Sequence, residues 1–397
     1  MNPDMLRAAL LQIHRYTGLA TLAFLVIASL TGCVLVFRGP IDRALNPDLF
    51  YAQSTAATAE ASVRAVSRWA AANPDLQILS FPLHPGEQRT ITLSVAAKPG
   101  RPATTYDEVF VDPASGAFVG GRSSDAGIDR RHLIKGVADL HFDLVAGTPG
   151  RWFLGVVAVA WLLSSLAGLY LTFPERGGFW RSWWRNWQFR RSSKLPRLLL
   201  DLHRASALWL FPFLLILAAT SAALNFFGEF YAPAVTKMWP LEHDLFDSDP
   251  PPRNPADPRL TLAEGLAAAQ AHADRTGLEW QPATMLYLPD WNFYGVKFSP
   301  DGVLDYSNLG PVDYYVDADT GAYRHEVDPY TDTMGLKAIR VVYPLHSGEI
   351  FGPVTVALVF VLGLATLLQS LTGLYIWWKK RKSRVAARRA HRRKAAA

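Results

Sequence analysis

The sequence predicts a membrane α-helical bundle of four transmembrane helices, built as an internal two-fold repeat, with two α+β modules outside the membrane. The composition supports a membrane protein, because 50% of the 397 residues are hydrophobic and only 19% are charged. Four apolar stretches are also long enough for a bilayer, which takes roughly 20 residues of helix. The single cysteine, Cys33, excludes an internal disulfide, a Cys-based zinc site and a Cys-ligated iron–sulfur cluster, because each needs more than one thiol.

The hydropathy pattern divides the chain into eight parts. The four predicted spans, the first with its short N-terminal extension, are residues 1–37, 151–173, 203–228 and 352–378. The connecting parts are the modules at 38–150 and 229–351, a basic linker at 174–202 and a basic tail at 379–397.

The charges of the linker and the tail predict the orientation. Between Lys379 and Lys394 the tail holds ten Lys or Arg and no acid. Basic segments stay on the cytoplasmic side, so we expect both termini in the cytoplasm and both modules in the periplasm of a bacterium, with the helices in its inner (plasma) membrane. The tail is expected to contact anionic lipid, with docking of an electron-donor protein as the alternative.

An internal repeat is the most informative feature of the sequence. Residues 111–175 match residues 316–380 at a constant offset of 205, and the first and third spans match at an offset of 189. His14-Arg15 then corresponds to His203-Arg204, and Thr31 to Thr220. Each half therefore contains one helix, an outer module and one helix back.

Alternating apolar residues and turn signals predict the modules. We expect an amphipathic helix followed by antiparallel strands in each half. The predicted helices are 62–72 and 261–277, the strands are 89–95, 108–111, 294–298 and 313–316, and the turns are 112–116 and 317–321. Residues 247–258, with five prolines, are expected to form an irregular loop.

Four histidines fall at positions that the repeat pairs. His14 and His203 lie near the cytoplasmic starts of the first and third spans, and His141 and His346 precede the second and fourth. A histidine at membrane depth needs a partner, and haem iron takes two axial nitrogens across a flat apolar ring. The pattern predicts two b-type haems, one ligated by His14 with His203 and one by His141 with His346. A packing or interface histidine is the alternative for any one of them alone.

Other residues near these histidines have two possible roles. Arg15 and Arg204 are candidates to pair with haem propionates or to reach lipid headgroups. Gly18, Gly32, Gly168 and Gly373 would admit a porphyrin or allow close helix packing. The remaining histidines are interpreted as surface residues, of which His132 and His325 keep a possible contact with substrate: they are His84, His132, His243, His272, His325 and His391.

At these residues the sequence resembles the PepSY-associated transmembrane family and, within it, bacterial siderophore-iron reductases of the FoxB type. The resemblance covers nearly the whole chain: the His-Arg start of spans one and three, the V-D-x-x-[ST]-G turn of PepSY-like modules, the Leu-His before spans two and four, and the S-L-x-G-L-Y close. It implies haem binding and reduction of ferric iron in siderophores at the periplasmic face. It also implies that His14, His141, His203 and His346 are the axial ligands. The second half departs from the pattern, because Ala207 stands where the first half has Gly18.

The leading hypothesis is therefore a ferric-siderophore reductase of the inner membrane that receives electrons from a separate cytoplasmic donor or from quinone. No nucleic-acid partner is predicted. Trp291, Phe293 and Tyr294, in the most aromatic outer loop, are the candidate substrate contacts, although a strand turn explains them too. The alternatives are a non-catalytic membrane-anchored PepSY binding module and a transporter for iron or a siderophore.

Overall fold

The computed structural model describes residues 3–55, 58–124, 129–190, 194–242 and 258–395, with side chains up to Lys382. It divides into two compact units. The first, the helical unit, consists of residues 1–36, 137–231 and 345–397, and the second, the sheet unit, consists of residues 37–136 and 232–344. The loop expected at 247–258 lies outside the described residues except for Pro258, as do His243 and the side chain of His391.

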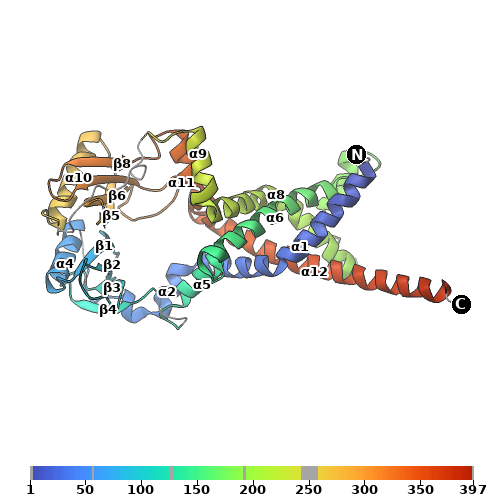
Figure 1. The fold of residues 1–397 in the computed structure, drawn as a ribbon, viewed down its shortest axis with the longest axis horizontal. Helices are drawn as coiled ribbons and strands as arrows, with labels where there is room; N and C mark the ends of the chain where they lie inside the picture. Colours follow the sequence, from blue (N-terminus) through green and yellow to red (C-terminus); the bar gives the residue numbers. More distant parts are fainter. Residues whose placement is uncertain (1–2, 56–57, 125–128, 191–193, 243–257, 396–397) are drawn as a thin grey trace. The chain divides into compact units, whose positions relative to one another are not determined.

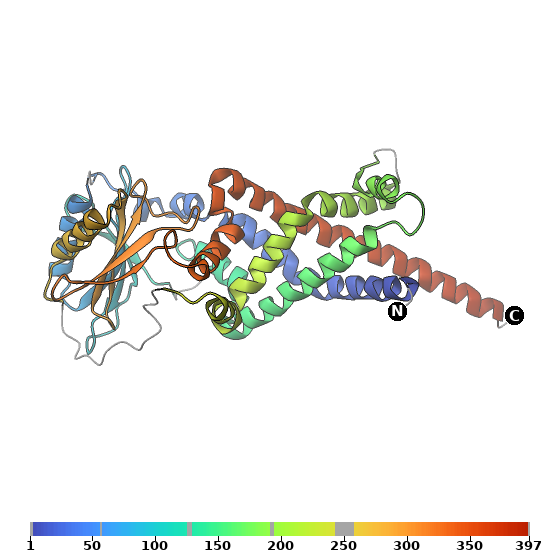
Figure 2. The same ribbon diagram turned by 90° about the horizontal axis from the view of Figure 1, so that it is seen from above.

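Four long apolar helices form the helical unit, and each is long and apolar enough to cross a membrane. They are α1 (Pro3–Leu35), α6 (Gly147–Thr172), α8 (Leu195–Asn225) and α12 (Pro353–Ala395). Helix α1 packs on α6 and α12, and α8 packs on the same two helices. Helices α1 and α8 therefore face each other diagonally in the bundle (Figure 1 and Figure 2).

The ends of two spans differ from the prediction. Helix α8 begins at Leu195, inside the predicted linker, because Pro196 suits the first turn of a helix. Helix α12 continues through the predicted tail to Ala395, since no glycine or proline follows Gly373. The N-terminus and the far end of α12 lie at the same end of the helical unit (Figure 1).

The predicted linker folds back onto the bundle. It contains α7 (Phe179–Trp184) and a short 3-10 helix, η1 (Arg185–Trp187). The Trp183 indole donates to Thr172 Oγ1 at 3.0 Å, and the Asn186 amide donates to the Thr172 carbonyl at 2.7 Å. Trp180 stays exposed.

Shorter helices complete the two units. They are α2 (Arg38–Leu45), α3 (Pro47–Phe50), α4 (Ala59–Ala72), α5 (Leu133–Asp143), η2 (Phe227–Tyr231), α9 (Ala232–Met238), α10 (Leu262–Thr276), α11 (Met334–Ser347) and η3 (Glu349–Phe351). Helix α10 begins with a capping box formed by Thr261 and Glu264.

One antiparallel sheet of eight strands forms the sheet unit, in the order β4-β3-β2-β1-β5-β6-β7-β8. The strands are β1 (Leu76–Pro82), β2 (Ile91–Ala97), β3 (Glu108–Val111), β4 (Phe118–Arg122), β5 (Gln281–Leu288), β6 (Phe293–Ser299), β7 (Val312–Asp317) and β8 (Tyr323–Val327). Helices α4 and α10 cover one face, and the apolar core lies between them and the sheet (Figure 2).

The prediction of two separate modules needs correction. Strand β1 pairs with β5, with Ser80 opposite Leu286 and Phe81 opposite Met285, so the strands of both halves form one continuous sheet. A lone four-stranded sheet would expose an unpaired inner edge, and this pairing removes it. The predicted turns are present: Asp112 and Asp317 each accept hydrogen bonds from the backbone amides of the residues that follow.

Candidate functional site

Four histidines meet as two pairs inside the helical unit. His14 on α1 faces His203 on α8, with ring centroids 6.4 Å apart and ring planes at 64°. His141 on α5 faces His346 on α11, with centroids 6.3 Å apart and planes at 50°. We call these the inner pair and the outer pair. All four rings are half-buried, and each pair is the one that the sequence predicts.

Both rings of the inner pair are oriented by a neighbouring helix through Nδ1. The Ser164 carbonyl of α6 accepts from His14 Nδ1 at 2.9 Å, with the Ser164 hydroxyl at 3.1 Å. The Gln369 carbonyl of α12 accepts from His203 Nδ1 at 3.1 Å, with Thr372 Oγ1 also at 3.1 Å. A carbonyl only accepts, so each Nδ1 carries the proton.

The outer pair follows the same rule with threonine hydroxyls. His141 Nδ1 lies 2.9 Å from Thr31 Oγ1, and His346 Nδ1 lies 3.2 Å from Thr220 Oγ1. Each hydroxyl already donates to a carbonyl of its own helix: Thr31 donates to the Ile27 carbonyl at 2.7 Å, and Thr220 donates to the Ile216 carbonyl at 2.9 Å. The hydroxyl oxygens therefore accept from the rings, and Nδ1 is again the protonated nitrogen.

This shared tautomer decides what the rings offer chemically. With the proton on Nδ1, the lone pair is on Nε2, which is the form of imidazole that binds a metal. A hydrogen bond on the other nitrogen is what usually fixes such a ligand. The sequence did not predict these acceptors, although Thr31 and Thr220 correspond to each other in the repeat.

The spacing of the rings tests whether haem iron fits between them. An imidazole nitrogen binds iron at about 2 Å, and the ring centroid lies about 1.2 Å behind that nitrogen. Two axial imidazoles on one iron therefore have centroids about 6.4 Å apart. The observed distances of 6.4 and 6.3 Å match this value. The residues present fit a bis-histidine haem at both pairs.

Three of the four glycines noted in the sequence lie against these rings. A Cβ atom would lie 3.0 Å from His14 Cε1 at Gly168, 3.1 Å from His141 Cε1 at Gly32 and 3.3 Å from His203 Cε1 at Gly373. Gly18 has nothing within 4 Å of such an atom. Because these three residues have no side chain, they leave room for the imidazole rings. The sequence had instead predicted room for a porphyrin or for close helix packing at these glycines.

The two predicted propionate partners have neighbours of their own. Arg15 donates to Gln12 Oε1 at 3.3 Å, and Arg204 donates to Asn186 Oδ1 at 2.7 Å. Arg204 also lies 3.8 Å from the buried Asp201 carboxylate. A guanidinium has five N–H donors, so both side chains retain further donors.

The predicted substrate loop proves to be the hairpin between β5 and β6. Trp291 and Phe293 are partly exposed, with ring centroids 6.1 Å apart. Tyr294 is only 4% exposed and donates its hydroxyl to the Leu260 carbonyl at 2.9 Å. The assignment of Tyr294 as a substrate contact was wrong, because its side chain belongs to the core between the sheet and α10.

Two histidines expected on the surface are buried in the sheet unit. His132 is 8% exposed and His325 is 9% exposed. His132 Nδ1 lies 2.9 Å from Asp129 Oδ1. The His325 ring lies 6.1 Å from that of Tyr315, on the sheet face away from α10. Contact with a substrate in solution is therefore not available to either ring as placed.

A charged cluster lies beside His325 on that face. Asp313 accepts from Lys297 Nζ at 2.7 Å and from Arg340 Nη2 at 3.1 Å. Burial, and then the nearby Asp313 carboxylate, raise the pKa of the Tyr315 hydroxyl. Lys297 and Arg340 thus stabilise the buried negative charge of Asp313, and we assign no catalytic role to this cluster.

Four helices able to cross a membrane and a separate α+β unit define a multi-pass membrane protein. The family model of the PepSY-associated TM region matches residues 11–380, and the chain belongs to this family. A comparison with curated proteins found no match.

Proposed function

We propose that this chain is an inner-membrane haem b protein that reduces ferric iron in siderophore complexes at the periplasmic face and so aids iron release and uptake. The observation that carries the proposal is the two histidine pairs at bis-imidazole spacing, with all four rings held through Nδ1. Haem bound there would supply one-electron redox chemistry.

The internal repeat supports a pair of equivalent sites. Ser164 and Gln369, the carbonyl partners of the inner pair, are related by the offset of 205, and Thr31 and Thr220, the hydroxyl partners of the outer pair, by the offset of 189. The same hydrogen bond thus recurs in both halves. A duplicated ancestor with one histidine of each pair would produce this arrangement.

The positions of the two pairs support electron transfer across the membrane. Thr31, which contacts the outer pair, lies 17 residues after His14 on α1. At a rise of 1.5 Å per residue this is about 25 Å, most of the roughly 30 Å hydrocarbon core. A redox group at each end would lie close to one membrane face. The basic linker and tail support the cytoplasm as the donor side.

Proteoliposomes test the function. The full chain with haem is reconstituted into vesicles that enclose the impermeant reductant dithionite, with a ferric siderophore and the Fe(II) indicator ferrozine outside. We expect ferrozine colour with the wild-type chain and only the background of empty vesicles with His346→Ala.

The alternatives make different predictions in the same vesicles. A siderophore transporter would accumulate labelled siderophore inside without needing the enclosed reductant. A non-catalytic anchored module would contain no haem and give no colour. Either result would contradict the reductase proposal.

A further inference from the structure

Three arginines surround one buried carboxylate near the start of helix α8. Asp201 is only 4% exposed. Its carboxylate lies 3.9 Å from Arg190 Nε, 3.3 Å from Arg197 Nε and 3.8 Å from Arg204 Nη2. We call these four residues the arginine cluster. The basic linker contributes Arg190 and α8 contributes the other three, so the cluster lies wholly within the helical unit.

The arginine cluster contains more positive than negative charge. Arg204 is the most buried of the three arginines, and it also donates to Asn186 Oδ1 at 2.7 Å. One carboxylate neutralises one guanidinium, and arginine keeps its proton in proteins. In the part of the chain that the structure describes, Arg190 and Arg197 pair with no acidic side chain other than Asp201. Two positive charges are therefore left for anions from outside the chain.

The two outer arginines present the donors that a phosphate needs. Arg190 and Arg197 both approach Asp201 through Nε, so their terminal nitrogens, Nη1 and Nη2, point to no partner among the described residues. Both side chains are 44% exposed, which puts these donors within reach of a ligand. A guanidinium is a planar fork of N–H donors that matches the oxygens of a phosphate. Asp201 holds the two forks beside each other.

Exposed tryptophans lie next to the arginine cluster. Trp184 and Trp209 are each 53% exposed, and the Trp209 indole donates to the Trp187 carbonyl at 3.0 Å. Asn186, the neighbour of Trp187, is the residue that holds Arg204. Tryptophan side chains concentrate at the membrane interface, at the depth of the lipid headgroups. This surrounding favours a phosphate that belongs to a lipid over a soluble anion or an acidic protein.

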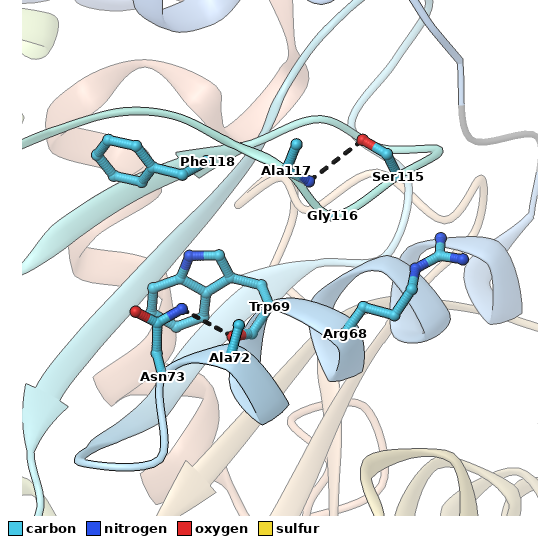
Figure 3. A pocket seen from close by; sticks show the side chains of 8 residues that line it. All are labelled: Arg68, Trp69, Ala72, Asn73, Ser115, Gly116, Ala117 and Phe118. Atoms are coloured by element: carbon cyan, nitrogen blue, oxygen red, sulfur yellow. Dashed lines mark hydrogen bonds between the residues drawn. The ribbon is translucent and has the colours of Figure 1, made fainter.

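A small hollow in the sheet unit shows what a place without such convergence looks like. It is lined by Arg68 and Trp69 from α4 and by Phe118 from β4, and the Arg68 guanidinium extends away from both rings (Figure 3). Groups that point apart define no ligand, and we assign none to this hollow. In the arginine cluster, by contrast, three guanidiniums lie within 4 Å of one carboxylate.

We propose that the arginine cluster binds the anionic headgroup of a phospholipid in the cytoplasmic leaflet, with phosphate oxygens on Arg190 and Arg197. Asp201 and Arg204 are positioning residues that hold the two forks. Basic pockets at the cytoplasmic ends of membrane helices suit cardiolipin, whose two phosphates match the two unpaired charges. The inference uses the proposed orientation of the chain, and it does not rest on haem binding or on iron reduction.

Lipid titration of the delipidated full chain in detergent tests the proposal. Cardiolipin is added in steps, and the unfolding temperature is recorded at each step. We expect a saturable rise, because a ligand of the folded state stabilises it, and no such rise with phosphatidylcholine, which has no net charge. The double variant Arg190→Gln with Arg197→Gln should need about tenfold more cardiolipin for the same rise, since charge-assisted hydrogen bonds are lost.

Two further variants separate the site from general charge and from folding. Arg181→Gln removes one charge from an exposed residue of the same linker that does not touch Asp201, and it should respond to cardiolipin as the wild type does. Arg190→Gln alone leaves Arg197 and Arg204 on Asp201, so the fold keeps its buried ion pairs. It should still weaken the cardiolipin response about threefold or more.

Three results would overturn the proposal. They are an equal rise with cardiolipin and phosphatidylcholine, an equal cardiolipin response in the double variant and the wild type, and a loss in Arg181→Gln as large as in Arg190→Gln. Inorganic phosphate that reproduces the whole rise would replace the lipid with a soluble anion, and polyglutamate that exceeds it would replace the lipid with an acidic protein. A haem count on the same samples keeps this test separate from that of the redox function.

Discussion

Removing one hydroxyl from the outer pair gives the sharpest test of the tautomer argument. Thr31→Val keeps the shape of the side chain but removes the oxygen that accepts from His141 Nδ1 at 2.9 Å. The valine methyl group cannot accept, so the Nδ1 proton loses its hydroxyl partner and keeps only the Ala28 carbonyl as an acceptor. The ring is then held less firmly in its orientation and tautomer.

The size of the effect follows from the lost hydrogen bond. Loss of one such hydrogen bond costs about 0.5–1.5 kcal/mol, and each 1.4 kcal/mol is about a factor of ten in affinity. Loss of such a partner of a metal-binding histidine typically lowers metal affinity by about 10- to 100-fold. We expect the outer haem of Thr31→Val to be lost at haem concentrations that saturate the wild type.

The same helix offers a matched control. Thr21 is also buried, and its hydroxyl donates to the Thr17 carbonyl at 3.0 Å and makes no contact with a histidine in the described residues. Haem titration followed by visible absorption compares the two variants. Thr21→Val should bind two haems as the wild type does. If Thr31→Val binds haem with the same affinity as Thr21→Val, the proposed role of Nδ1 is refuted.

Three further predictions concern the route of electrons and the stability of the sheet unit. His346→Ala should remove the outer haem and lower ferric-siderophore reduction at least about 100-fold, with the inner haem spectrum retained; unchanged reduction would exclude the outer pair from the route. Gly116→Ala should lower the unfolding temperature far more than Gly100→Ala. Both glycines have positive φ (75° and 76°), but only at Gly116 would a Cβ atom meet backbone, 2.2 Å from the Ala65 carbonyl oxygen. Equal shifts of the unfolding temperature would contradict this close contact between Gly116 and Ala65. Burial alone would raise the pKa of Asp317, but hydrogen bonds from Arg324, Thr320 and the turn amides outweigh it and lower the pKa below the ordinary 3.8. The ionised Asp317 therefore stabilises the fold above that pH, and the contribution is lost as the pH falls through the lowered pKa. Asp317→Asn should lower the unfolding temperature by about 2–6 °C at pH 7 and make little difference near pH 2; an equal shift at both pH values would contradict this.

The histidine pairs were predictable from sequence because a repeat relates residues that share a depth in the bundle. His14 and His203 begin matching helices, so any fold that keeps the two-fold relation brings them together. The carbonyl acceptors of Ser164 and Gln369 were not predictable, since every residue has a carbonyl and only packing decides which one meets a ring. The threonine acceptors had a signal in the repeat, but hydroxyls within a helix usually bond their own backbone.

The single sheet and the buried histidines were missed for another reason. Alternation in β1 and β5 specifies which face of a strand is buried, and it does not specify which strand lies alongside. The pairing of Ser80 with Leu286 joins segments far apart in the chain, so local sequence has no information on it. His325 was predicted to be a surface residue for a similar reason. The side chains that bury it belong to other strands, such as Tyr315, and local sequence does not specify them.

A pyridine haemochrome assay on the purified full chain, expressed with ample haem, tests the central claim most directly. The predicted result is two b-type haems per polypeptide in this count and, in the absorption spectrum of the intact reduced protein, the sharp bands of low-spin bis-histidine iron. A chain that binds no haem, or binds it with a high-spin spectrum, would contradict the assignment of His14 with His203 and His141 with His346 as axial pairs.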